Sequence, residues 1–262
     1  TLILGPTYSE YSRELSFSGS TQDYYHLQEA EDFELDVEDL CRTLLNGYDF
    51  LILCNPNNPT SSAILKDEMR ALLSFCANRD IFVMIDETYV EFAPSVQEVT
   101  AVPYTKEFSN LMVLRGVSKF YAAPGMRFGY GITGNKEFLS QMKEKQIPWS
   151  LNSLGAYAGE QMFKDTSYIR QTRSLILTER DRMFLELKKM PSFKVYFPYG
   201  NFILVKILKP EVTSFDVFEA CIKEGLMIRD CSSFQCLDGE FIRFCIMKPE
   251  DNNRLLNVLK TI

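Results

Sequence analysis

Polar segments follow several apolar runs of this sequence, and their side chains are of the kinds that bind ligands. They occupy residues 55–60 (NPNNPT), 86–89 (DETY) and 115–119 (RGVSK), the last followed by 124–127 (PGMR). In an open sheet of parallel strands, ligands bind beyond the carboxyl ends of the strands. Successive strand ends would therefore bring carboxylate, amide, phenol, amine and guanidinium groups to one edge of the sheet.

Each segment also has an ordinary explanation when taken alone. Asn-Pro pairs form turns, an Asp after a strand caps the next helix, and a single Lys is usually a solvated surface charge. The combination is more specific, because an acid, an amide, a phenol, a lysine and an arginine in this order meet the needs of one cofactor. That cofactor is pyridoxal 5'-phosphate (PLP).

The ring of PLP sets the first requirements. PLP withdraws electrons only while its pyridine nitrogen is protonated, and a carboxylate at hydrogen-bond distance enforces this. Asp86 is the candidate for that carboxylate. Asn58 and Tyr89 are neutral side chains suited to the phenolic oxygen of the ring.

The aldehyde and the phosphate set the remaining requirements. The aldehyde must be captured by an amine that later acts as a base, and Lys119 is the candidate. The phosphate dianion needs a planar cation together with hydroxyl and backbone donors, and Arg127 and Ser118 would supply part of that set.

Four segments resemble the motifs of class I/II aminotransferases: 55–60 (NPNNPT), 86–89 (DETY), 118–119 (SK) and 125–129 (GMRFG). The resemblance covers essentially the whole chain. It implies that Lys119 holds PLP as a Schiff base and that Asp86 is the partner of the pyridine nitrogen. It also implies that Asn58 and Tyr89 bind the phenolate oxygen and that Arg127, eight residues after the lysine, binds the phosphate.

Three further positions follow from the same resemblance. Residues 6–8 (PTY) are similar to the Pro-Thr-aromatic turn of the family, which makes Tyr8 the candidate for stacking on the cofactor, with an ordinary core tyrosine as the alternative. Arg243 lies in a segment similar to the strand whose arginine binds the substrate α-carboxylate, and a charge inside an apolar strand is otherwise costly. Arg229 is a second cation for the substrate, or else a salt bridge at the rim.

Within the family, the chain most resembles histidinol-phosphate aminotransferase and threonine-phosphate decarboxylase. Residues 119–125 (KFYAAPG) and 228–231 (IRDC) are slightly more similar to the decarboxylase. The resemblance implies a PLP-dependent aminotransferase acting on an α-amino acid or amino-phosphate. Decarboxylation of a phospho-amino acid is one alternative, because the orientation of the substrate decides which bond to the α-carbon breaks. A non-catalytic module of the same fold is another.

The elements that must position these residues alternate between strand and helix patterns. Apolar runs predict buried strands at 50–53, 81–85, 111–114 and 128–132. Apolar residues at helical spacing predict helices within 37–45 and 65–76. This alternation predicts an α/β fold with a mostly parallel sheet flanked by helices, which is the large domain of the fold type I PLP-dependent transferases.

The second half of the sequence has a different organisation. Helical periodicity extends over residues 136–190 with interruptions near Pro148 and Asp165, which indicates helices that bridge two domains. Beyond Pro191, alternating apolar runs, a helix over 214–223 and a final helix after Pro249 predict a small α+β domain. We therefore expect a large PLP-binding domain with bridging helices over residues 1–164 and a small domain over residues 165–262.

Composition excludes several classes of protein. The formal net charge is -7 and no run of Lys and Arg is clustered, which argues against a nucleic-acid partner. No apolar stretch approaches the roughly 18 residues of a membrane span, and no signal region is visible, so we expect a cytoplasmic protein. The resemblance implies small-molecule amino acid and keto acid substrates. The seven cysteines contain no Cys-x-x-Cys pair, which indicates reduced thiols and no metal site.

The sequence begins at Thr1 and continues directly into an apolar run. We interpret it as a fragment that lacks the N-terminal segment of the family. The resemblance implies that this segment carries a helix start for the cofactor phosphate and an arm that closes the site across a homodimer. We therefore expect PLP to bind more weakly to this chain than to one that includes the segment.

Overall fold

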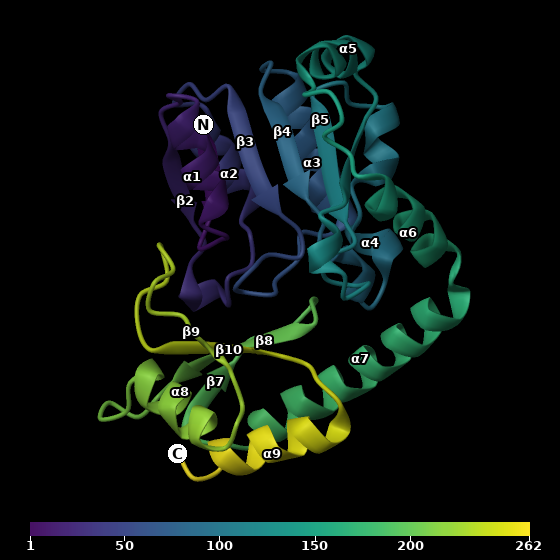
Figure 1. Ribbon diagram of the computed structural model, residues 1–262. Coiled ribbons are helices and arrows are strands. Elements are labelled where there is room, and N and C mark those ends of the chain that lie inside the picture. The colour runs from purple at the N-terminus through teal and green to yellow at the C-terminus, as the bar shows by residue number, and fades with distance from the viewer.

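The computed structural model describes residues 1–262, which form two sheets joined by helices (Figure 1). The larger sheet has the strand order β2-β1-β3-β4-β5-β6. Its strands are β1 (Leu2–Gly5), β2 (Asp23–His26), β3 (Phe50–Cys54), β4 (Phe82–Asp86), β5 (Leu111–Gly116) and β6 (Gly129–Thr133). All neighbours are parallel except β5 and β6, which are antiparallel. The predicted α/β fold with a mostly parallel sheet is confirmed.

Helices cover this sheet and bury the apolar runs of its strands. The segments before β3 and β4 contain α2 (Val37–Leu44) and α3 (Lys66–Ala77), as expected from their spacing. Both helices pack their buried leucines into one core with the strands. Helix α2 begins where the Asp36 side chain accepts a hydrogen bond from the Asp39 amide at 2.9 Å, which is a typical N-cap.

Three helices lead from the larger sheet to the smaller one: α5 (Lys136–Lys145), α6 (Ser153–Lys164) and α7 (Thr166–Leu187). They are separated near Pro148 and at Asp165, as the sequence predicts. Asn152 and Asp165 cap α6 and α7 through their side chains. Figure 1 shows α7 passing along one side of the molecule to the smaller sheet. No helix is both long and apolar enough to cross a membrane.

The smaller sheet is antiparallel, with the strand order β7-β8-β10-β9. It consists of β7 (Phe193–Val195), β8 (Phe202–Ile207), β9 (Arg229–Asp230) and β10 (Phe241–Cys245), and it packs with α8 (Ser214–Lys223) and α9 (Pro249–Leu259). The predicted α+β organisation of this half is therefore confirmed. The division of the chain at residue 165 stays a prediction.

Helix α7 also fixes the smaller sheet against the larger one. Arg180 is almost fully buried, and its guanidinium donates to the carbonyls of Phe92 at 2.9 Å and Gly200 at 3.2 Å. Phe92 belongs to the chain just after β4, and Gly200 precedes β8. The Arg180 side chain thus connects the backbone after β4 to the backbone before β8.

Candidate active site

The strand ends of the larger sheet and strand β10 of the smaller sheet enclose a cavity of about 330 Å³. Eight of the nine residues predicted from the sequence line it: Tyr8, Asn58, Asp86, Tyr89, Ser118, Lys119, Arg127 and Arg243. The ninth, Arg229, lines a neighbouring cavity that shares Tyr8, Asn58 and Arg243 with the first. The parallel register of the strands brings these side chains together, because it places the ends of β3, β4 and β5 side by side.

Asp86 ends β4, and three donors fix its carboxylate. Oδ1 accepts from the Thr88 amide at 2.9 Å and from the Thr88 hydroxyl, and Oδ2 accepts from the Tyr11 hydroxyl at 2.7 Å. An ionised carboxylate can accept about four hydrogen bonds. One acceptor position therefore remains on Oδ2, which suits a single N–H donor such as a protonated pyridine nitrogen.

Tyr11 is a site residue that the sequence analysis missed. It lies on α1 (Glu10–Phe17), lines the cavity, and its ring packs edge-on against Tyr8 with centroids 5.8 Å apart. Burial, followed by the proximity of Cys54 and Asp86, raises the pKa of Tyr11, so the phenol remains a neutral donor. The spacing of three residues from Tyr8 is the only signal in the sequence that pointed to it.

The loop after β3 presents only one of its three asparagines to the cavity. The Asn55 amide donates to the carbonyls of Ile64 and Val99, both at 3.0 Å. The Asn57 amide donates to the carbonyl of Pro6 at 2.8 Å, so both side chains hold the loop in shape. Asn58 is the third, and its Oδ1 accepts a hydrogen bond from Arg243. A single bond thus joins a predicted cofactor ligand to a predicted substrate ligand.

Tyr89 and Lys119 face the same cavity from consecutive strand ends. Tyr89 is buried, and its burial, followed by the proximity of Cys54, raises the pKa of the phenol. It is therefore a neutral hydrogen-bond donor at physiological pH. The Lys119 Nζ lies 5.9 Å from the centroid of the Tyr89 ring, and the Lys119 side chain is exposed toward the cavity.

Ser118 and Arg127 line the end of the cavity formed by the segment after β5, and both carry hydrogen-bond donors. The Arg127 guanidinium donates once within the protein, from Nη1 to the Pro124 carbonyl at 3.0 Å. Its other N–H groups and the Ser118 hydroxyl can bind oxygen atoms of a phosphate.

A buried ion pair connects the ends of strands β4 and β5. Glu87 is fully buried, and its Oε2 accepts from Arg115 Nε at 3.0 Å, from Arg115 Nη2 at 2.7 Å and from the Thr100 hydroxyl at 2.8 Å. The pair links the end of β4 to β5 next to Asp86 and Lys119. The sequence analysis recognised Glu87 only as part of a motif and assigned it no role.

Comparison with known proteins identifies the family. A family model described as aminotransferase class I and II matches residues 1–259. The chain belongs to the class I and II aminotransferases. This family is PLP-dependent, so both the resemblance and the cofactor inferred from the sequence are confirmed. The donors around Asp86 and the acidic, basic and phenolic groups of the cavity fit that cofactor.

Proteins similar to this chain include members of both subgroups that the sequence predicted. Threonine-phosphate decarboxylase from Salmonella typhimurium is 30% identical over 261 residues, which are 100% of this chain and 70% of the relative. Histidinol-phosphate aminotransferase from Methanococcus aeolicus is 30% identical, covering 98% of this chain and 67% of the relative. The crystal structure of histidinol-phosphate aminotransferase from Clostridium acetobutylicum matches with a TM-score of 0.92 and 33% identity, covering 99% of this chain and 76% of that one.

Proposed function

We propose that this protein is a PLP-dependent aminotransferase acting on an α-amino acid or amino-phosphate, with Lys119 as the lysine that binds the cofactor. The observation that supports it is the convergence of Lys119, Asp86, Tyr89 and Arg243 on one cavity between the two sheets. These groups come from three different strand ends and from the smaller sheet. Each supplies a different interaction that the cofactor and an amino acid require together.

PLP, when bound, supplies the electron sink for the reaction. Lys119 binds it covalently and afterwards moves the proton at the substrate α-carbon. Asp86 holds a proton on the pyridine nitrogen through its remaining acceptor position. Asn58 and Tyr89 bind the phenolic oxygen, and Arg243 binds the substrate carboxylate as a planar, two-pronged cation.

Three other side chains complete the cofactor site in this proposal. Arg127 and Ser118 bind the phosphate. Tyr8, which is 46% exposed and lines the cavity, stacks on the ring of the cofactor. A flat aromatic surface on one face of the ring would restrict its position without adding charge.

The phospho-amino-acid decarboxylase is the second candidate, and the Salmonella typhimurium relative favours it. The same cofactor residues serve both reactions, because only the orientation of the substrate selects the bond that breaks. Product analysis separates the two: transamination releases a keto acid, and decarboxylation releases carbon dioxide.

The test of the proposed function uses the Lys119→Ala variant and spectroscopy of the PLP-loaded protein. In the wild type, PLP bound to the lysine should absorb visible light and become fixed by borohydride. Both signals should be lost in Lys119→Ala and retained in Lys136→Ala, which removes an exposed lysine at the start of α5. A borohydride-stable adduct in Lys119→Ala would assign the cofactor to another lysine. Wild-type protein that binds PLP but converts no amino acid would instead favour the non-catalytic module.

We also propose that the protein is a homodimer. The segment from the end of α5 to the first turns of α6 exposes apolar side chains to solvent. The exposed fraction is 97% for Trp149, 77% for Leu154 and 66% for Tyr157. Exposed apolar side chains gathered on one segment are typical of a protein interface. A second copy of the chain is the occupant expected from the family resemblance.

A cytoplasmic location is part of the same proposal. All seven cysteines are unpaired in the structure, which suits a reducing compartment. The partners proposed are small molecules, namely amino acids and keto acids.

A further inference from the structure

Phe202, the first residue of β8, contacts one proposed ligand group from each sheet, and its side chain is almost fully buried. The Phe202 ring packs edge-on against the Tyr89 ring, with centroids 5.0 Å apart and an angle of 79° between the ring planes. The Arg243 guanidinium lies 5.0 Å from the centroid of the same Phe202 ring. Phe202 does not line the cofactor cavity, so an effect on the cofactor or the substrate would pass through these two neighbours.

The pairing of β8 with β10 explains how the Phe202 ring reaches Arg243. The two strands are antiparallel, with Leu204 opposite Arg243 and Phe202 opposite Cys245. Residues two apart on a strand point to the same face, and residues directly opposite each other share a face. Phe202 is therefore a diagonal neighbour of Arg243 on one face of the smaller sheet.

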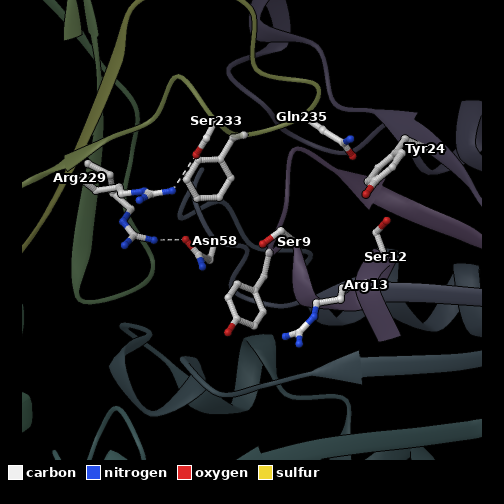
Figure 2. Close-up of a pocket in the computed structure, with 11 residues that line it drawn as sticks. Ser9, Ser12, Arg13, Tyr24, Asn58, Arg229, Ser233 and Gln235 are labelled. Carbon is white, nitrogen blue, oxygen red and sulfur yellow. Dashed lines mark hydrogen bonds between the residues drawn. The ribbon is translucent and has the colours of Figure 1, made fainter. Parts of the chain in front are cut away.

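The Arg243 guanidinium has few other polar contacts within the protein. It donates to Asn58 Oδ1, and the dashed line at Asn58 in Figure 2 marks this bond. Its Nε is buried and has no hydrogen-bond partner. A cation close to an aromatic ring is attracted by the negative face of the ring, most strongly where water is excluded. Together with Asn58, the Phe202 ring therefore orients the guanidinium.

The Tyr89 ring depends on Phe202 in a similar way, because the edge-on contact with Phe202 is its one aromatic contact. Edge-to-face packing has a preferred geometry, so it restricts the ring and hence the position of the phenolic hydroxyl. Burial and the proximity of Cys54 raise the pKa of Tyr89, whereas Arg243 opposes this rise. Tyr89 and Arg243 thus affect each other electrostatically while both contact the same ring.

The backbone before Phe202 is fixed to both halves of the molecule. The Gly200 amide donates to Ser61 Oγ at 2.8 Å, and the Tyr199 amide donates to the Ser61 carbonyl at 2.8 Å, in the loop after β3. From α7, Arg180 donates to the carbonyls of Tyr199 at 3.1 Å and Gly200 at 3.2 Å. These bonds set the start of β8, and with it the Phe202 ring, relative to the larger sheet.

We propose that Phe202 is a positioning residue for the reaction, whose ring fixes Tyr89 and Arg243 relative to each other. This role rests on the proposed function, in which Tyr89 binds the phenolic oxygen of the cofactor and Arg243 binds the substrate carboxylate. Because both side chains pack on one ring, Phe202 sets the position of the substrate anchor relative to the cofactor.

The absorbance of lysine-bound PLP reports on both neighbours of Phe202 without any turnover. The absorbance changes with pH as the nitrogen that joins PLP to the lysine gains or loses a proton. A nearby cation disfavours the positively charged nitrogen, and a donor to the phenolic oxygen withdraws negative charge that would stabilise the proton. Tyr89 and Arg243 should both lower the midpoint of this change, so loosening them should raise it.

The test is an absorbance titration of the PLP-loaded protein with pH. Phe202→Leu and Phe202→Met both remove the ring but keep an apolar side chain, and each should raise the midpoint by roughly half a unit to one unit. Phe244→Leu is the matched control, because Phe244 is equally buried on β10 but points to the opposite face from Arg243. It should leave the midpoint unchanged while lowering stability to urea by a similar amount.

A double variant tests whether the effect passes through Tyr89. Tyr89→Phe keeps the ring but removes the hydroxyl, so it should raise the midpoint by itself. Adding Phe202→Leu to Tyr89→Phe should then produce a smaller shift than Phe202→Leu produces in the wild type, because one of its two routes is already lost. A fully additive shift would contradict the route through Tyr89.

Two results would overturn the positioning role and leave the proposed function intact. One is a midpoint in Phe202→Leu and Phe202→Met that is unchanged or lowered. The other is an equal shift in Phe202→Leu and Phe244→Leu, which would assign the effect to a general loss of packing. A wild-type protein in which borohydride fixes no PLP would instead refute the proposed function, and the role of Phe202 with it.

Discussion

The carboxylate of Asp86 depends on neighbours that are close in space but not all close in sequence. Thr88 is two residues away and forms a local turn with it, whereas Tyr11 is 75 residues away and reaches Oδ2 from α1. Together they fix the plane of the carboxylate and leave one position for a donor in the cavity. Asp86 is therefore held in one orientation, as its proposed role as partner of the pyridine nitrogen requires.

Replacing Tyr11 with Phe should weaken PLP binding by about three- to tenfold. The loss of one hydrogen bond to a charged group would allow Asp86 to reorient. A PLP titration followed by absorbance measures the change. Tyr25→Phe serves as the control, since the Tyr25 hydroxyl donates to Asp39 Oδ2 at 2.9 Å away from the site. Tighter binding in Tyr11→Phe would show that the hydroxyl competes with the cofactor for Oδ2.

At the scale of elements, the position of the site depends on how the ends of β4 and β5 are held together. The Glu87–Arg115 pair does this with three hydrogen bonds to Glu87 Oε2, counting that of Thr100. The pair lies away from water, so removing one partner leaves a buried charge without compensation. Asp86 and Lys119, at the ends of the same strands, depend on that alignment.

The substitution Arg115→Met should lower the free energy of unfolding by about 3 kcal/mol, because the buried Glu87 would lose the cation and the two hydrogen bonds that offset its burial. Urea denaturation measures the loss. Arg70→Met is the comparison, since Arg70 pairs with Glu107 on the surface, where both side chains are about half exposed. That change should cost less than about 1 kcal/mol. Similar losses in both variants would contradict a special role for the buried pair.

At the scale of the whole molecule, ionic contacts join the two sheets at a point away from the cavity. Glu29, in a short turn after β2, accepts from Lys206 Nζ at 2.6 Å and from the Tyr196 hydroxyl at 2.9 Å. Partial burial opposes ionisation of Glu29, but the bonds from Lys206 and Tyr196 prevail and lower the pKa of its carboxyl group. The ionised form of Glu29 therefore stabilises the folded state through this contact.

Stability from this contact should depend on pH in a defined direction. A carboxyl group with a lowered pKa stabilises the fold above its unfolded pKa of about 4.3, and this contribution disappears as pH falls through the lowered value. Wild type should thus be more stable than Glu29→Gln at pH 7, and the two should converge in acid. Urea denaturation across this range provides the measurement. A difference that stays constant with pH would assign the effect to packing.

The proposed homodimer can be tested through Trp149, the single tryptophan of the chain. Light scattering should give twice the 30.2 kDa of one chain, and Trp149→Asp should shift the protein toward the monomer by placing a charge in an apolar interface. The fluorescence of wild-type Trp149 should move to longer wavelength on dilution as the indole becomes exposed. A monomer at all concentrations with unchanged emission would refute the interface.

The sequence alone determined much of the fold and the chemistry of the site. Helix α8 was expected over 214–223 and covers Ser214–Lys223, because its apolar spacing is local information. The motifs containing Asp86, Lys119 and Arg127 were recognisable for a similar reason, since each is a short run of residues next to a strand. By contrast, β2 and α1 were not predicted, because both are short and neither has a buried apolar face.

Only the tertiary structure decided which of these groups act together. Asn58 and Arg243 are 185 residues apart and share a hydrogen bond, and Tyr11 reaches Asp86 across 75 residues. Arg13, on helix α1, and Arg229, on strand β9 of the smaller sheet, line one cavity. Such contacts arise from the packing of α1 and the smaller sheet over the ends of the parallel strands. No local sequence pattern predicts these contacts. The free energy that stabilises them comes from burial of the whole hydrophobic core and not from interactions between neighbours along the chain.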